Sequence, residues 1–153
     1  MKTFSIFLLC FIFVSVCFAE NIIPKQNRVI LKEKTEFIPY EEIWIPTEEE
    51  TNIALTSIVA LLKDKESHKD MPDYNKRNIE NIYNNLSSFR VQFVGIINKG
   101  NKRILCNFMH NHLDHPDWKK DYITVFNGGW SYWSVEVDII TGKCINLYIH
   151  GEA

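Results

Sequence analysis

The sequence predicts an α+β fold in which two N-terminal helices pack on a five-stranded antiparallel meander sheet. In residues 47–63 and 74–88, which a charged loop at residues 65–72 separates, apolar residues recur every three or four positions. From residue 89 onward, apolar residues alternate with polar ones in runs that turn residues separate. Because helical and alternating patterns occupy separate parts of the chain, we expect the helices to cover one face of an antiparallel sheet.

Residues 1–19 are predicted to be a signal peptide. Lys2 gives the segment a positive start, residues 4–18 carry no charge, and Cys17 and Ala19 place small residues at the −3 and −1 positions of a cleavage site. The apolar run is shorter than the roughly 20 residues that a membrane span needs. We therefore expect an exported protein, periplasmic or secreted, that begins at Glu20 and has no transmembrane segment. A lipid-anchored outer-membrane form, acylated at Cys17, is the alternative.

Residues 20–46 are predicted to be a packed lead-in segment, and residues 47–153 a single α+β domain. The lead-in has too many apolar residues for a disordered tail, and residues 28–31 are expected to form a short strand. Without the leader, 134 residues (153 minus 19) remain, which is the size of one domain. Their 16 basic residues (17 minus Lys2) and 19 acidic residues give a formal charge of −3 without a basic stripe, which argues against nucleic acid as a partner.

Two helices are predicted. Thr47 and Glu50 have the spacing of a capping box, and the acidic residues that follow Thr47 favour the positive end of a helix. This first helix is expected to run to Lys63. The second is expected over residues 74–88, where the apolar side chains that share one face are Ile79, Ile82, Tyr83, Leu86 and Phe89.

Five strands are predicted at residues 91–97, 103–109, 122–126, 130–139 and 145–149. Gly95 interrupts the first strand and indicates a bulge or a close approach of another backbone. Lys99-Gly100-Asn101 is expected to turn the chain, and Asn127-Gly128-Gly129 is expected to form a hairpin turn, because these residues tolerate positive φ. By analogy of architecture, the nearest common folds are cystatin-like and nuclear-transport-factor-like sheets.

The segment His110-Asn111-His112-Leu113-Asp114-His115 reads H-x-H-x-D-H. It resembles the metal-binding signature of the metallo-β-lactamase superfamily, which implies a zinc site formed by His110, His112, Asp114 and His115. The chain is too short for that fold: 38 residues follow His115 (153 minus 115), and His150 is the one histidine among them. We therefore expect no such hydrolase and no cofactor, with a local Zn²⁺ site as the alternative.

Aromatic residues and cysteines supply two further candidate features. Trp130, Tyr132 and Tyr148 are expected to share the sheet face opposite Trp133, where they could form a ligand-binding surface for a glycan or a protein. The alternative is that the lead-in, with Trp44 and Ile45, covers this face. In an exported protein, Cys106 and Cys144 could form a disulfide. The strand phases place the two cysteines on opposite faces, which favours two buried thiols instead.

Several C-terminal motifs resemble a group of small exported bacterial proteins without a known activity, whose tails read DGG-aromatic, YD-x-x-TGK and NG-x-A. The matching stretches are Asn127-Gly128-Gly129-Trp130, Val137-Asp138, Thr141-Gly142-Lys143 and His150-Gly151-Glu152-Ala153. The resemblance implies a bacterial exported domain. We expect a non-enzymatic binding domain whose partner is an extracytoplasmic protein or a cell-envelope polymer. The alternatives are a metal-binding protein or metal-dependent enzyme, and an inhibitor of an extracellular hydrolase.

Overall fold

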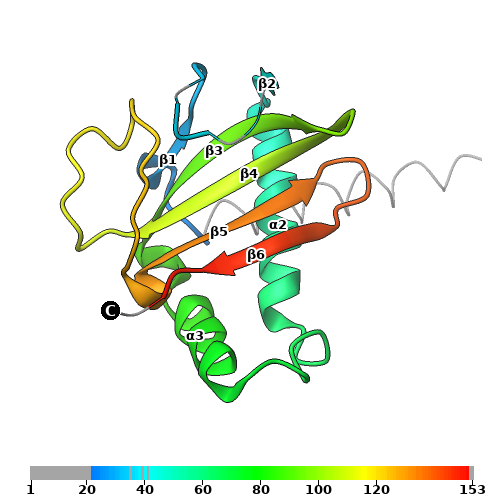
Figure 1. The fold of residues 1–153 in the computed structure, drawn as a ribbon, viewed down its shortest axis with the longest axis vertical. Coiled ribbons are helices and arrows are strands. Elements are labelled where there is room, and N and C mark those ends of the chain that lie inside the picture. The colour runs from blue at the N-terminus through cyan, green and yellow to red at the C-terminus, as the bar shows by residue number, and fades with distance from the viewer. Residues whose placement is uncertain (1–21, 35, 39, 41, 152–153) are drawn as a thin grey trace, which may run out of the picture.

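The computed structural model describes residues 22–34, 36–38, 40 and 42–151, so the predicted leader lies outside the described residues. Within them, two α-helices pack against a mixed sheet of six strands (Figure 1). The predicted α+β class is therefore confirmed. The strands are β1 (Arg28–Ile30), β2 (Glu42–Trp44), β3 (Phe89–Asn98), β4 (Asn101–His110), β5 (Tyr132–Asp138) and β6 (Cys144–Ile149).

The first helix, α2 (Glu48–Lys63), begins as predicted. The Thr47 hydroxyl accepts a hydrogen bond from the Glu50 amide at 3.2 Å, and the Glu50 carboxylate accepts one from the Thr47 amide at 2.7 Å. The second helix, α3 (Asp73–Asn84), ends earlier than predicted, because residues Leu86–Ser88 form a short 3-10 helix, η2, before β3. In Figure 1, α2 runs behind the sheet and α3 lies beside one end of it.

The sheet has the order β1-β3-β4-β5-β6, in which β3 to β6 are antiparallel neighbours. The β3–β4 and β5–β6 pairs were predicted, whereas the direct pairing of β4 with β5 was not. The five-stranded antiparallel meander is nevertheless wrong in detail. β1 pairs in parallel with the first half of β3, and β2 pairs antiparallel with its second half. The Arg28 guanidinium donates hydrogen bonds to Ile23 O at 2.8 Å and to Asn52 Oδ1 of α2 at 2.9 Å, which connects β1 to the helix layer.

The predicted strand at residues 122–126 and its hairpin turn are not present. Residues 111–131 instead form one long connection from β4 to β5, which ends in the short 3-10 helix η3 (Gly129–Ser131). Gly128 and Gly129 do adopt positive φ, as predicted, but their amides donate to Gly151 O instead of closing a hairpin.

The main core lies between the helices and the sheet. Its centre is an aromatic group in which Phe108 and Trp133 stack at 3.8 Å between ring centroids and Phe89 meets Trp133 edge-on. Smaller apolar clusters fill the other face of the sheet beneath the lead-in and the 111–131 connection. Both faces of the central strands are therefore covered.

Gly95 marks a close approach and not a bulge. Its register with Ile104 of β4 is continuous, and a Cβ atom at this position would lie 2.2 Å from the Trp44 carbonyl oxygen of β2. Only glycine allows β2 to pack this closely against β3.

An irregularity in the β5–β6 pairing shifts the phase of β6. The register slips between Ser134 and Glu136, opposite Asn146, which has a φ of 55°. One extra residue moves the following side chains to the other face. Cys144, Leu147 and Ile149 therefore all pack against the helix-side core.

Candidate functional site

The structure does not bring the four predicted metal ligands together. The rings of His110 and His112 share a hydrogen bond through their Nδ1 atoms, with centroids 4.3 Å apart. Burial and the neighbouring His112 lower the pKa of His110. His115 instead hydrogen-bonds through Nε2 to the Tyr132 hydroxyl. Asp114 joins none of these histidines in a metal site. Among residues 22–34, 36–38, 40 and 42–151, the structure contains no group of three or more His, Cys, Asp or Glu side chains that could hold a metal ion.

The three predicted ligand-binding aromatics lie on two sides of the molecule. Trp130 packs on the helix-side core, where its ring lies 6.2 Å from Phe89 between centroids, because it belongs to η3 and not to an extended strand. Tyr132 and Tyr148 lie on the opposite face, each in edge contact with the ring of His150. Tyr132 is buried, whereas Tyr148 has 56% of its surface exposed.

The two cysteines are free thiols on the same face of the sheet. Cys106 of β4 lies opposite Val135, and Cys144 of β6 lies opposite Val137, so β5 separates them. Two strand spacings amount to about 9–10 Å, which exceeds the roughly 7 Å Cα separation that a disulfide can bridge. The prediction of opposite faces is wrong because of the β6 irregularity. Burial raises the pKa of both thiols, that of Cys144 to about 11.

Sequence reasoning missed a buried polar cluster around Glu136. This carboxylate accepts hydrogen bonds from the Tyr40 hydroxyl, from Arg103 at 2.8 Å and from Asn146 at 3.0 Å. Burial alone would raise the pKa of Glu136, but these three donors hold it below its ordinary value. The cluster joins the lead-in, β4, β5 and β6. Its carboxylate is fully occupied by structural bonds.

A second set of buried polar side chains fixes the long connection. The Gln92 amide nitrogen donates to the carbonyls of Trp118 and Asp121 at 2.6 and 2.7 Å, and its oxygen accepts from the Ile123 amide at 3.0 Å. Asn107 donates to Ile123 O at 2.8 Å. The connection is therefore held on the sheet by side chains, and it covers the face on which a binding surface was predicted.

The two edges of the sheet differ. One edge is formed by β1 and β2, which are three residues long and contain the charged residues Arg28 and Glu42. The opposite edge is β6, which is hydrogen-bonded to β5 and ends the strand order of the described sheet. The six residues of β6 carry no charge, and its core-facing side chains are only partly buried. Natural sheets usually protect such an edge with charges, prolines or a covering segment.

No family model, curated protein or solved structure matches this chain. Within the ranges that the structure describes, no helix is long and apolar enough to cross a membrane. Function therefore has to be inferred from the geometry of the sheet edges, the buried polar groups and the surface.

Proposed function

We propose that the protein is an exported, non-enzymatic binding domain that takes up an extended segment of a partner protein along β6. The observation that carries this proposal is the contrast between the two sheet edges. One edge consists of β1 and β2, which are three residues long and contain Arg28 and Glu42, whereas the other is β6, which is six residues long and uncharged. An edge strand presents backbone N–H and C=O groups to which a further strand can add. Such strand addition is a common mode of peptide recognition.

The side chains of β6 support a protein strand as the ligand. Leu147 and Ile149 pack against the core but remain partly exposed, so an added strand would complete their burial. Tyr148 projects from the other face and is 56% exposed. A segment with alternating apolar residues would meet both surfaces, because successive side chains of a strand point to opposite faces.

The buried reactive groups support a binding role over catalysis. The raised pKa of the Cys106 thiol keeps it protonated and a poor nucleophile. Glu136 is engaged by three hydrogen-bond donors, and His115 is engaged by Tyr132. Zinc binding at the His110–His112 pair remains the alternative proposal. It requires further ligands from a partner or from a rearranged connection.

Selection from a displayed library of random 12-residue peptides tests this proposal without requiring the sequence of the partner to be known. We expect enriched peptides to carry alternating apolar residues. In NMR titrations they should shift the amide signals of β6 and leave those of β1 unchanged. Peptides that map to another surface, or a library that yields no binder, would contradict the proposal. If β6 instead pairs with β6 of a second molecule of this protein, the proposal of a separate partner protein is wrong.

A matched pair of variants distinguishes strand addition at β6 from non-specific binding of peptides to exposed aromatic side chains. Tyr148→Lys replaces a ring on β6 that is 56% exposed. Tyr74→Lys replaces a ring on α3 that is 37% exposed. We expect Tyr148→Lys to weaken peptide binding about tenfold, the effect of roughly 1.4 kcal/mol, and Tyr74→Lys to leave it unchanged. Equal losses in both variants would show that β6 is not the binding edge.

Export has its own test. The intact mass of protein purified from bacteria that express the full-length sequence is expected to show an N-terminus at Glu20. A chain that keeps its leader would contradict export. A chain that begins with an acylated Cys17 would assign the lipid-anchored form instead.

A further inference from the structure

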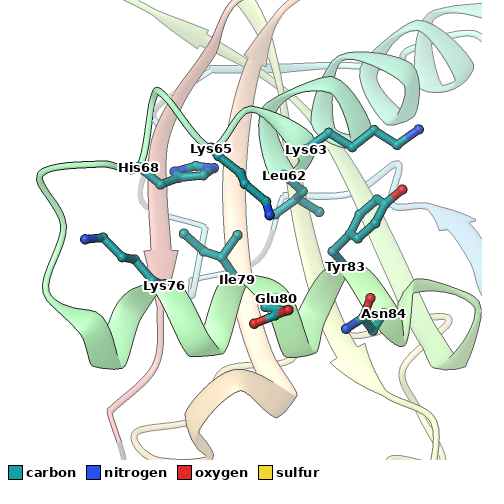
Figure 2. A pocket seen from close by; sticks show the side chains of 9 residues that line it. All are labelled: Leu62, Lys63, Lys65, His68, Lys76, Ile79, Glu80, Tyr83 and Asn84. Atoms are coloured by element: carbon teal, nitrogen blue, oxygen red, sulfur yellow. The ribbon is translucent and has the colours of Figure 1, made fainter.

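A second surface, remote in sequence from β6, has the form of a small-molecule site. A pocket of about 500 Å³ lies between the end of α2, the connection at residues 64–72 and α3 (Figure 2). This volume falls within the range of small-ligand sites, roughly 300–1,000 Å³. The lining residues are Leu62, Lys63, Lys65, His68, Lys76, Ile79, Glu80, Tyr83 and Asn84.

The pocket is positively charged although the chain as a whole has a net charge of −2. Three of its lining residues are lysines, against the single carboxylate of Glu80. Figure 2 shows the Lys65 side chain extending from the connection towards α3, across the pocket, whereas Lys63 and Lys76 point outward at opposite ends. The Lys63 ammonium lies 5.8 Å from the centre of the Tyr83 ring. This arrangement favours a ligand with one negative charge near Lys65.

The inner wall of the pocket is apolar. Leu62 and Ile79 are buried, and the ring of Tyr83 is partly exposed beside them. An aromatic ring and aliphatic side chains can cover the C–H face of a sugar ring as well as any other flat apolar surface. The wall therefore suits a ligand with a compact apolar face.

His68 adds a hydrogen-bonding requirement. It is only 5% exposed, and its Nε2 lies 2.8 Å from the Leu61 carbonyl oxygen, which can only accept. Nε2 therefore carries the hydrogen, and in the neutral ring Nδ1 is an acceptor. Nδ1 is buried and has no hydrogen-bond partner among the described residues. Buried polar atoms are rarely left unsatisfied, so a ligand hydroxyl that donates to Nδ1 would supply the missing bond.

We propose that this pocket binds an acidic sugar unit, a pyranose that carries a carboxylate. The carboxylate would lie at Lys65, the C–H face of the ring over Tyr83 and Ile79, and a hydroxyl at His68. This site does not depend on strand addition at β6. Its proposed ligand, an acidic sugar, has the chemistry of a unit of a cell-envelope polymer.

NMR titration with glucuronic acid tests the proposal on the purified protein. We expect binding in the millimolar range or tighter, with the amide signals of His68, Ile79 and Tyr83 shifting. Glucose tests the need for the charge, and it is expected to bind at least tenfold more weakly. Inorganic phosphate tests whether any anion suffices. Phosphate binding equal to that of glucuronic acid would reduce the site to a general anion site and overturn the sugar assignment.

Variants locate the ligand. Lys65→Gln is expected to weaken glucuronic acid binding about fivefold, in line with an exposed ion pair, and Tyr83→Leu is expected to weaken both sugars. Lys120→Gln, an exposed lysine on the 111–131 connection, is the charge-matched control and should change nothing. Tyr148→Lys on β6 should also leave sugar binding intact. Equal effects of the two lysine variants, or no binding of glucuronic acid at all, would overturn the proposal.

Discussion

Replacing Gly95 with alanine tests the packing of the lead-in on β3. In a strand interior, alanine is ordinarily about 0.5–1 kcal/mol more favourable than glycine, so propensity alone predicts a more stable protein. In the structure, however, the added methyl would lie 2.2 Å from the Trp44 carbonyl oxygen and 2.9 Å from two atoms of its ring. A rotamer change of Trp44 relieves the ring contacts but cannot move the backbone oxygen. β2 must therefore shift away from β3.

The expected cost combines three effects. Overpacking costs about 1–3 kcal/mol. The displaced Trp44 also loses its shared hydrogen bond to the carbonyls of Ile96 and Arg103, at 3.2 and 3.3 Å, which adds about 1 kcal/mol. Subtracting the favourable propensity of alanine leaves a net loss of about 2 kcal/mol in the free energy of unfolding. With a urea m-value of about 2 kcal/mol per molar, the unfolding midpoint falls by about 1 M.

Urea unfolding followed by circular dichroism measures this shift. Gly151→Ala is the control, because a Cβ atom there has no neighbour within 4 Å, and its midpoint should not change. In a Trp44→Ala background the hydrogen bond is already lost and the clash with the backbone oxygen remains. The cost of Gly95→Ala should therefore fall to about 1 kcal/mol. An unchanged or higher midpoint for Gly95→Ala alone would refute the close packing of β2 on β3.

Three further predictions concern titratable groups and thiols. Mass spectrometry under oxidising conditions should find Cys106 and Cys144 unbridged, and a mass lower by two hydrogens would contradict their separation by β5. Burial lowers the pKa of His110 and His150, so the unfolded state binds protons more readily. Stability should therefore be complete above about pH 6.5 and fall as the pH drops through this value. His150→Gln should flatten the dependence of the urea midpoint on pH, and an unaltered profile would contradict this origin. Zinc calorimetry should show no site tighter than about micromolar; a tighter site that His112→Ala removes would restore the metal proposal.

The sequence predicted correctly those features that depend on residues close together in the chain. The start of α2 depends on Thr47 and Glu50, which are three residues apart and form the predicted capping box. The β3–β4 hairpin likewise turns at Lys99 and Gly100, both with positive φ. In both cases the residues that determine the structure are neighbours in the sequence.

The predictions that failed depend on distant partners. Residues 122–126 alternate like a strand, but the backbone N–H and C=O of Ile123 are hydrogen-bonded to the side chains of Gln92 in β3 and Asn107 in β4. The phase of Cys144 depends on the irregularity at Asn146, which the alternation of β6 conceals. Trp130 follows two glycines whose positive φ turns the chain before β5 begins. The predicted shared face of Trp130, Tyr132 and Tyr148 was wrong for the same reason, since it rested on the phase of a strand that begins only at Tyr132.

These hydrogen bonds between residues distant in the sequence also determine which surfaces can bind a partner. The face opposite the helices is filled by the 111–131 connection, and the amides of Gln92 and Asn107 make its removal costly, because four of their hydrogen bonds would leave buried groups unsatisfied. Glu136 secures the lead-in in the same way through Tyr40. A ligand that had to displace either segment would lose these bonds, whereas a ligand at β6 or in the α2–α3 pocket displaces none of them. Binding at the sheet edge and between the helices is therefore compatible with an otherwise rigid domain.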